Sequence, residues 1–191
     1  MENQSEKNEG QSKLLKVREK YPNIWKTESS LMSYIRGGIR RSLWNRSPIK
    51  IEFIKNNRIR IPNPNPRGKV KEVWGAVCAL TGEVFPLNQI EVDHRVGGNA
   101  LKSMDDLQSF IEAIVLVTED DLQFVSKEAH KIKSYAEKQG ISFEEAMAVK
   151  KAIDIVKQKK DKQWLGERGI IPASTQAKRR EQVEQILKEN T

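Results

Sequence analysis

The stretch from Ile90 to Gly98, IEVDHRVGG, decides how the rest of the chain is interpreted. A short run that alternates apolar and polar residues predicts a half-buried β-strand. The strand ends in an acid, Asp93, next to an imidazole, His94, and successive side chains of a strand point to opposite sides. The 191-residue chain has only two histidines, and the second is His130. This strand end is therefore either an ordinary hydrogen-bonded position or half of a reactive centre.

The composition favours a small globular protein. A chain with 37% hydrophobic and 31% charged residues can bury one modest core with helical arms attached. No apolar run approaches the roughly 20 residues of a membrane span, and the polar residues 1–12 resemble neither a signal peptide nor a transit peptide. A single cysteine, Cys78, excludes an internal disulfide framework. We expect a cytoplasmic protein without membrane contact, in which residues 1–12 are disordered.

Charge is unevenly distributed along the chain, whose net charge is +8. Residues 33–71 contain eleven Lys or Arg residues against one acid, whereas residues 72–125 contain ten acids against two basic residues. The C-terminal part is basic again. An acidic middle between basic arms predicts a centre flanked by surfaces for a polyanion. From charge alone, the alternative that the Lys-rich helices are ordinary solvated faces stays open.

Local patterns predict the elements before the IEVDHRVGG stretch. Apolar residues four apart over 27–46 predict a helix with Thr27 or Ser29 as N-cap, which the pair Gly37-Gly38 weakens. Residues 47–57 begin with Ser-Pro, which favours a helix start, but their alternation also allows a strand. Residues 58–69 predict a short edge strand and then a Pro-rich loop.

Further elements follow on both sides of the stretch. Two or three short strands are expected over 70–94 with a turn at Thr81-Gly82, and a further strand over 121–126. A helix over 103–115 would be capped by Ser103, and a helix over 127–139 would be closed by Gly140. One long helix is expected over 142–165 with a Ser142/Glu145 capping box, and a final helix after Pro172.

Two segments now form one constellation. The first, EVDHRVGG, ends a strand in Asp93 and His94, and the second, DDLQFVSKEAHKIKS, is a strand that leads into a helix with His130 in its first turn. Two antiparallel strands and a helix can bring Asp93 and His130 together. Both histidines of the chain therefore fall at the functional points of one motif.

Together these segments resemble the two halves of the HNH nuclease motif, most of all in free-standing HNH endonucleases of phages. The likeness includes a "SxDDLxxFxE" helix, matched by residues 103–112, and covers about residues 70–138. It implies an α+β fold with a small ββα-metal core over 70–140. Basic helical arms would flank this core: an N-terminal DNA-binding arm over 13–69 and a C-terminal arm over 141–191.

The resemblance assigns a role to each residue of the constellation. His94 would be the general base, because a near-neutral imidazole can take a proton from water. Asp93 and His130 would hold one divalent metal ion, and a carboxylate with an imidazole suits Mg²⁺, Mn²⁺ or Zn²⁺ without selecting among them. No small-molecule cofactor is implied.

Basic side chains around the constellation are candidates for contact with the phosphate backbone, which would give salt-sensitive affinity with little dependence on sequence. The candidates are Arg95, Lys131, Lys133, Arg36, Arg40, Arg41, Arg58 and Arg60.

Two positions depart from the family pattern. The Asn that gives the motif its middle letter, which braces the loop behind the histidine, is replaced by Asp121, which can only accept hydrogen bonds when ionised. Asp121 would either serve in the catalytic site or tune the metal, with Asp120 as a rival. The positions that match the zinc-ribbon cysteines of many relatives are Cys78, Thr81, Ser126 and Ala129, so no structural zinc ribbon is expected.

The resemblance implies a metal-dependent DNA endonuclease or nickase of the phage or homing type. Its partner would be double-stranded DNA, and its location the host-cell cytoplasm if it is phage-encoded. A catalytically decayed HNH scaffold that binds or helps to package DNA is the alternative, motivated by Asp121 and the missing cysteines. An RNA nuclease is a third possibility. The sequence does not specify the oligomeric state, the DNA site or the metal.

Overall fold

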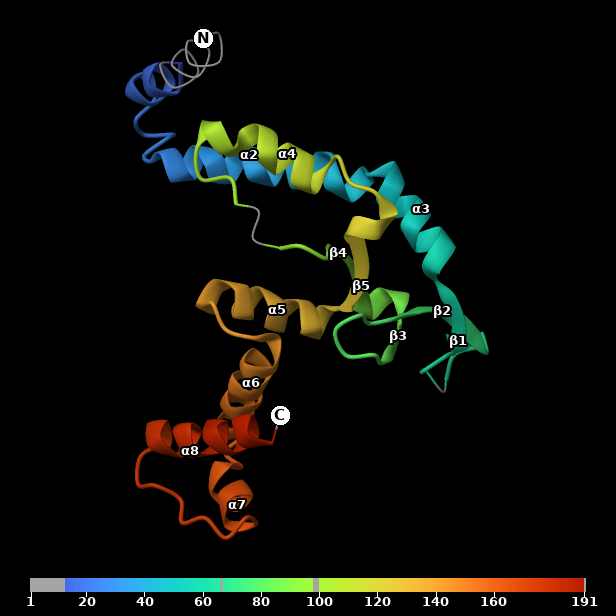
Figure 1. Ribbon diagram of the computed structural model, residues 1–191, viewed down its shortest axis with the longest axis vertical. Helices are drawn as coiled ribbons and strands as arrows, with labels where there is room; N and C mark the ends of the chain where they lie inside the picture. The colour runs from blue at the N-terminus through green and yellow to red at the C-terminus, as the bar shows by residue number, and fades with distance from the viewer. Residues whose placement is uncertain (1–12, 66, 98–99, 191) are drawn as a thin grey trace. The chain divides into compact units, whose positions relative to one another are not determined.

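A computed structural model describes residues 13–65, 67–97 and 100–190, so the disorder expected for residues 1–12 lies outside the described residues. The chain folds as a mixed α+β protein with two small antiparallel sheets (Figure 1). It divides into two compact units, the first extending to Val125 and the second beginning at Ser126. None of the described helices is long and apolar enough to cross a membrane.

The first unit opens with a helix over 13–20 and continues with α2 (Glu28–Ser42). The predicted N-cap is confirmed, because the Thr27 hydroxyl accepts the backbone N–H of Ser30 at 3.1 Å within a capping box. α2 runs through Gly37-Gly38 without a break. It ends earlier than the sequence predicts and passes into the short 3₁₀ helix η1 (Trp44–Arg46).

The segment for which the sequence allowed a helix or a strand is helix α3 (Pro48–Asn57). Its start follows the rule for helix N-termini, because Pro48 occupies the first turn and the Ser47 hydroxyl accepts the N–H of Lys50 at 3.3 Å. Phe53 is buried and packs on Phe124, with the ring centroids 4.8 Å apart. This aromatic contact fixes α3 against the strand that precedes the second unit.

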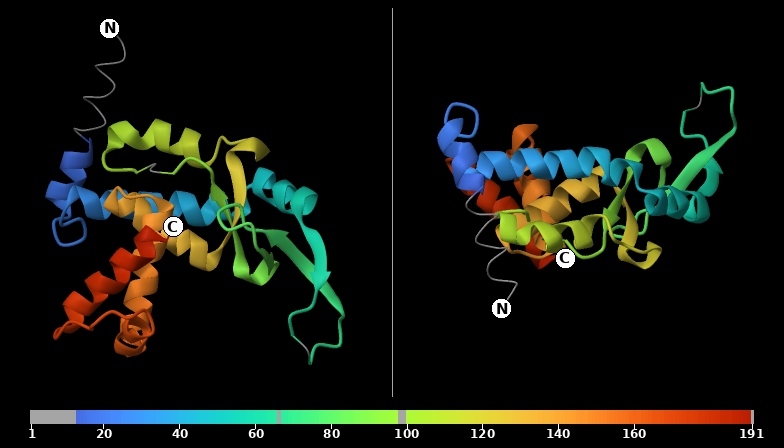
Figure 2. Two further views of the ribbon diagram at one scale, coloured as in Figure 1. Left: turned by 60° about the horizontal axis from the view of Figure 1, so that its bottom comes forward. Right: turned by 90° about the horizontal axis from the view of Figure 1, so that it is seen from above.

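The first sheet contains β1 (Ile59–Pro62), β2 (Glu72–Val77) and β3 (Val84–Pro86), in that order and antiparallel. β1 lies at an edge, as the sequence predicts. The turn between β2 and β3 contains Gly82 with φ +72°, a conformation that favours glycine. Figure 2 shows β1 and β2 side by side up to the loop that joins them.

The second sheet pairs β4 (Ile90–His94) with β5 (Leu122–Ser126), and η2 (Leu87–Gln89) leads into β4. Between them lie η3 (Met104–Asp106), α4 (Leu107–Ile114) and η4 (Glu119–Asp121). Every residue of β5 is buried. Phe110 and Ile114 of α4 pack with Met32 of α2 in the core of this unit, and α2 and α4 run side by side in Figure 1.

Four helices are described in the second unit: α5 (Lys127–Gln139), α6 (Phe143–Lys157), α7 (Asp161–Gly166) and α8 (Gln176–Glu189). α5 follows β5 directly. Its N-cap is Ser126, whose hydroxyl accepts the N–H of Ala129 at 3.1 Å. Its C-cap is Gly140 with φ +66°, and the prediction that Gly140 closes this helix is confirmed. α6 packs against α5 and α8.

The prediction of one long helix over 142–165 is wrong. α6 ends at Lys157, and Lys159 has φ +58°. The N–H of Lys159 bonds to the carbonyl of Val156 and that of Lys160 to Ile155, both at 3.0 Å. This is the Schellman pattern that closes helices, which glycine usually completes. A lysine completes it here, so the sequence gives no stop signal.

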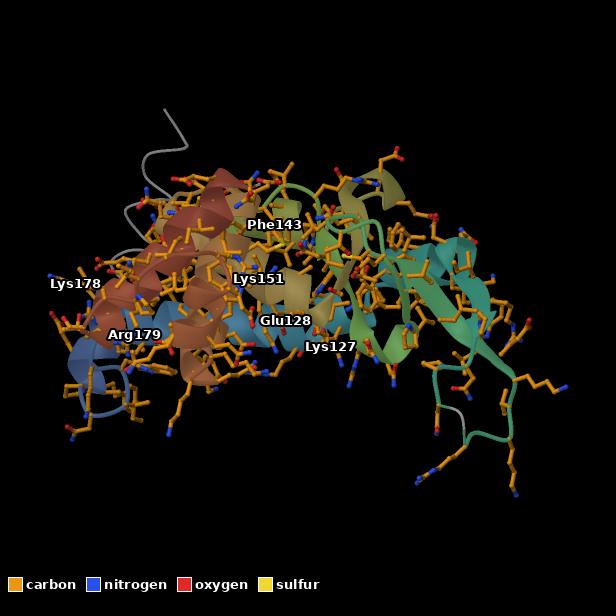
Figure 3. All side chains as sticks on the ribbon, turned by 90° about the horizontal axis from the view of Figure 1, so that it is seen from below. Lys127, Glu128, Phe143, Lys151, Lys178 and Arg179 are labelled. Carbon is orange, nitrogen blue, oxygen red and sulfur yellow. The ribbon has the colours of Figure 1, made fainter. Side chains whose placement is uncertain are left out.

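A buried ion pair joins α7 to α8. The Arg179 side chain, labelled in Figure 3, is 11% exposed and that of Asp161 is 7% exposed, and Arg179 Nε lies 2.5 Å from Asp161 Oδ2. Arg179 also donates to the carbonyls of Ala173 and Ser174 at 2.9 Å. The hydrogen bond from Arg179 is the main reason that the pKa of Asp161 lies below its ordinary value.

We predict that Arg179→Ala lowers the free energy of opening at the amides of Leu165 and Val183 by about 3–5 kcal/mol, because it leaves the Asp161 charge buried and unpaired. Native-state hydrogen exchange measures this quantity. Arg180→Ala is the matched control, since Arg180 is the exposed next residue of α8. Because the pKa of Asp161 is lowered, the contribution is complete above about pH 4 and is lost as the pH falls through that lowered value. Equal exchange in both variants would contradict the prediction.

Candidate functional site

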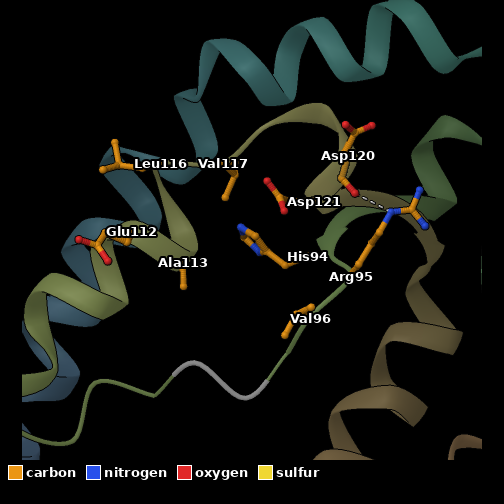
Figure 4. Close-up of a pocket in the computed structure, with 9 residues that line it drawn as sticks. All are labelled: His94, Arg95, Val96, Glu112, Ala113, Leu116, Val117, Asp120 and Asp121. Atoms are coloured by element: carbon orange, nitrogen blue, oxygen red, sulfur yellow. Dashed lines mark hydrogen bonds between the residues drawn. The ribbon is translucent and has the colours of Figure 1, made fainter.

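His94 lies in a pocket of about 330 Å³ within the first unit (Figure 4). The pocket is formed by the end of β4, the C-terminal half of α4 and the η4 turn. Its lining residues are His94, Arg95, Val96, Glu112, Ala113, Leu116, Val117, Asp120 and Asp121. The sequence-predicted catalytic pair, His94 and Asp121, is therefore brought together in one cavity.

A backbone carbonyl fixes the ring of His94. Its Nε2 lies 3.3 Å from the carbonyl oxygen of Ile114, the last residue of α4. Because a carbonyl can only accept a hydrogen bond, this contact favours the neutral tautomer with the proton on Nε2 and the lone pair on Nδ1. Carbonyls at a helix C-terminus also carry partial negative charge, which stabilises a nearby cation. This arrangement suits a ring that gains a proton during a reaction.

An aromatic contact holds the same ring from the side. Trp44 and His94 have ring centroids 4.3 Å apart, and Lys50 Nζ lies 4.8 Å from the centroid of Trp44. Burial lowers the pKa of Lys50, and the carboxylate of Glu91 acts in the opposite direction. The imidazole is thus positioned by η1 and by the end of α4, two elements of the first unit that lie far apart in sequence.

Asp121 braces the loop next to His94. Its carboxylate Oδ2 accepts the N–H of Thr118 at 2.8 Å and the Thr118 hydroxyl at 2.9 Å, and its backbone carbonyl accepts the N–H of Arg95 at 2.8 Å. The two bonds from Thr118 lower the pKa of Asp121 most, and the charge of His94 lowers it further. Both partners on Thr118 are donors, so a residue that only accepts fits this position.

Neighbouring contacts extend the brace to α3 and β4. Arg95 Nε donates to the backbone carbonyl of Asp120 at 2.9 Å, the dashed line in Figure 4, and the Arg95 side chain is exposed at the pocket. Asn56 and Asn57 at the end of α3 donate to the carboxylate of Glu119 at 3.0 and 3.4 Å. The η4 turn is therefore held from both sides.

The two residues predicted as metal ligands lie in different units. Asp93 is half-buried on β4 in the first unit, and His130 is a half-buried residue in the first turns of α5 in the second. Asp93 does not line the His94 pocket, which agrees with the opposite directions of adjacent strand residues. Their joint role as metal ligands stays a prediction.

The donor chemistry of this pair fits a divalent cation. One carboxylate and one imidazole are enough where phosphate oxygens and water complete the coordination. Among the described residues no group of three or more His, Cys, Asp and Glu side chains is arranged for a metal ion.

The zinc-ribbon positions lack a donor set that fits structural zinc. Cys78 is the single thiol, Thr81 accepts the N–H of Glu83, and Ser126 caps α5.

The predicted phosphate-binding cations differ in their surroundings. Lys131 and Lys133 of α5 approach Glu128 and Glu137 at 3.4 and 3.7 Å, and the Lys133 side chain is only 14% exposed. Three further candidates are arginines of α2 in the first unit. Arg36 donates to the hydroxyl of Ser33, and the guanidinium of Arg40 lies 6.0 Å from the ring centroid of Phe110. Arg41 is exposed, and its guanidinium lies beside Gly37. Arg58 and Arg60 both lie over the ring of Trp74.

Sequence reasoning missed three groups that hold His94 and Asp121 in place. No sequence pattern singles out Trp44, and the carbonyl of Ile114 has no signature of its own. The contact between Thr118 and Asp121 does have a signal, because they are three residues apart in the spacing of a capping box. The same spacing joins Ser103 to Asp106, which confirms the predicted cap before α4.

Comparison with protein-family models, curated proteins and solved structures found no match to this chain.

We predict that neutral His94 is the Nε2–H tautomer, because its partner is a carbonyl. Long-range ¹H–¹⁵N correlation spectra at a pH where the ring is neutral report the protonated nitrogen directly. A His130→Ala variant assigns the signals, since the chain has only two histidines. An Nδ1–H tautomer for His94 would contradict the geometry.

We further predict that Asp121→Ala speeds amide hydrogen exchange at Thr118 and Arg95, because the turn loses both acceptor bonds to its side chain. Asp120→Ala is the control, because it leaves both bonds from Thr118 to the Asp121 carboxylate in place, and it should exchange like the wild type. The lowered pKa of Asp121 means that the brace persists down to pH values below about 4 and weakens as the pH falls through the lowered value. Equal exchange in the two variants would show that the carboxylate does not hold the turn.

Proposed function

We propose that the protein is a metal-dependent endonuclease or nickase that hydrolyses phosphodiester bonds of double-stranded DNA. The proposal assigns β4, β5 and α5 to a ββα-metal core, as the HNH resemblance implies. The observation that carries it is the orientation of His94, whose Nε2 faces the carbonyl of Ile114 and whose lone pair is therefore on Nδ1. A fixed imidazole of this tautomer is what a general base requires.

In the proposed mechanism His94 Nδ1 takes a proton from a water molecule that attacks the scissile phosphorus. The P–O3′ bond breaks as the new P–O bond forms, and the leaving 3′ oxygen takes a proton from solvent water, which leaves a 5′ phosphate and a 3′ hydroxyl. The imidazolium that forms is stabilised by the helix-end carbonyl of Ile114. Trp44 keeps the ring from rotating away while the proton moves.

Asp93 and His130 would hold the divalent cation, which supplies charge stabilisation to the phosphate and the leaving oxygen when it is bound. Arg95 is the protein cation next to His94, and its exposed guanidinium suits a phosphate oxygen. Its bond to the carbonyl of Asp120 limits its rotamers, so it would position the backbone of the DNA rather than attract it from a distance.

A second candidate function follows from two departures from the HNH motif. Asp121 stands where the motif has Asn, and three of the four zinc-ribbon cysteines are absent. The protein would then be a DNA-binding or DNA-packaging accessory on an HNH scaffold without catalysis. The two bonds that the Asp121 carboxylate accepts from Thr118 support the enzyme, since they hold the loop behind the histidine despite the substitution.

The test is a plasmid-nicking assay with Mg²⁺, Mn²⁺ and Zn²⁺ in turn. We expect the wild type to nick duplex DNA and His94→Ala to lose at least about 100-fold in rate, the lower end of what a general base contributes. Gln89→Ala, an exposed change just before β4, controls for general damage, and circular dichroism checks the fold of each variant. Equal nicking by the wild type and His94→Ala would reject His94 as the base. Binding without nicking under every metal would favour the accessory role.

A further inference from the structure

The outer part of the β1–β2 pair is a two-stranded ribbon. β3 pairs with β2 only from Gly75 to Val77, whereas β1 pairs with β2 outward to Pro62 and Glu72. One more backbone bond, from Asn63 N–H to the carbonyl of Lys71 at 2.8 Å, extends the pairing towards the loop. Beyond Gly75 the ribbon therefore has no third strand on either side among the described residues.

The two faces of this ribbon differ in chemistry. Ile61 of β1 lies over Gly75 of β2, where an added Cβ would come within 2.5 Å of its Cδ1. This face is apolar. Arg60 pairs with Trp74 across the strands, so these two side chains share the opposite face. Arg58, the extended residue just before β1, also has its guanidinium over the Trp74 ring and so lies on that face.

Trp74 organises the cationic face. The guanidinium carbons of Arg58 and Arg60 are each 4.0 Å from the centroid of the Trp74 ring, within cation–π distance. Neither guanidinium forms an ion pair within the described part of the chain, and the Nε of Arg58 is buried without a hydrogen-bond partner there. Two positive charges are thus held close together by one ring, and among the described residues neither is paired with an acid, although Glu72 lies on the same face of β2.

The loop at the end of the ribbon is also basic, and asparagines form hydrogen bonds between its described residues. Asn63 donates to the carbonyl of Val70 at 2.8 Å and accepts the N–H of Asn65 at 2.9 Å, and Asn65 accepts the N–H of Arg67 at 3.1 Å. Three basic side chains of this loop are exposed: Arg67, Lys69 and Lys71. Between residues 58 and 72 there are five Lys or Arg residues and one acid.

We propose that this ribbon docks into the major groove of duplex DNA, with Arg58 and Arg60 on phosphates at one wall and the basic loop on the backbone beyond. The major groove of B-form DNA admits a two-stranded β-ribbon, whereas the corresponding groove of duplex RNA is too deep and narrow for side chains to read. The inference rests on the proposed function in taking duplex DNA as the partner, but it needs no catalysis.

The test is fluorescence anisotropy of the full chain with a labelled DNA duplex over a range of salt concentrations, in EDTA so that no cleavage occurs. Each phosphate contact contributes about 0.9 to the slope of log affinity against log salt. We expect the Arg58→Gln/Arg60→Gln variant to lose about 2 from that slope and at least about tenfold in affinity. The Arg67→Gln/Lys69→Gln variant should lose a similar amount from the slope.

Two control variants test whether DNA binding depends on the arrangement of the ribbon side chains or only on the net positive charge of the protein. Arg168 lies outside the ribbon, and its guanidinium carbon is 3.7 Å from the centroid of the Trp164 ring, so it has the same kind of tryptophan contact. Arg168→Gln should therefore change the salt slope by less than about 0.9, the value of one phosphate contact. Trp74→Leu keeps the net charge and should weaken binding about threefold, the scale of one exposed cation–π contact. Circular dichroism confirms that each variant is folded.

The second part of the test measures binding to duplex RNA of the same sequence under the same conditions. The wild type should prefer DNA, and the Arg58→Gln/Arg60→Gln variant should lose that preference. An unchanged salt slope in this variant, or equal binding of DNA and RNA by the wild type, would overturn the inference. These outcomes are independent of the nicking assay: a chain that cuts nothing but binds through the ribbon would count against the nuclease and leave the ribbon standing.

Discussion

The candidate site depends on the contact between His94 and the carbonyl that ends α4. That single contact favours the tautomer with the proton on Nε2, and with it Nδ1 as the atom that could act as a base. Other features of the unit support it. α4 is held on α2 by Phe110 and Ile114, Trp44 reaches the ring from the end of the α2 segment, and the η4 turn is tied to α3 through Glu119. Contacts from α4, η1 and the η4 turn therefore converge around the imidazole of His94.

Much of this fold could be predicted from local sequence. Thr27, Ser103 and Gly140 mark helix ends through hydrogen bonds and φ values that act within a few residues, and these expectations are confirmed. The break at Lys159 could not be predicted, because a lysine takes the left-handed position that usually calls for glycine. The alternation before Asn57 allowed either a helix or a strand. The structure shows helix α3, whose Phe53 packs on Phe124 of β5, a residue far away in sequence.

The candidate site shows the same division. The HNH resemblance selected His94 and Asp121 for one site, and both line one pocket. The groups that orient them come from tertiary contacts, which sequence patterns do not reveal: a backbone carbonyl belongs to every residue, and nothing in the sequence links Trp44 to His94. The replacement of Asn by Asp at position 121 becomes understandable only with Thr118, whose two donors need an acceptor. A substitution that suggests decay in the sequence thus has a structural partner.

The central claim is that the imidazole of His94 acts as a base, and chemical rescue tests it most directly. In a plasmid-nicking assay of His94→Ala, added imidazole should restore cleavage in proportion to its unprotonated fraction, because a free imidazole would occupy the space between Trp44 and the Ile114 carbonyl and accept the proton. The wild type should not respond to imidazole. Nicking by His94→Ala that is restored by no concentration of imidazole, while its DNA binding equals that of the wild type, would contradict the account.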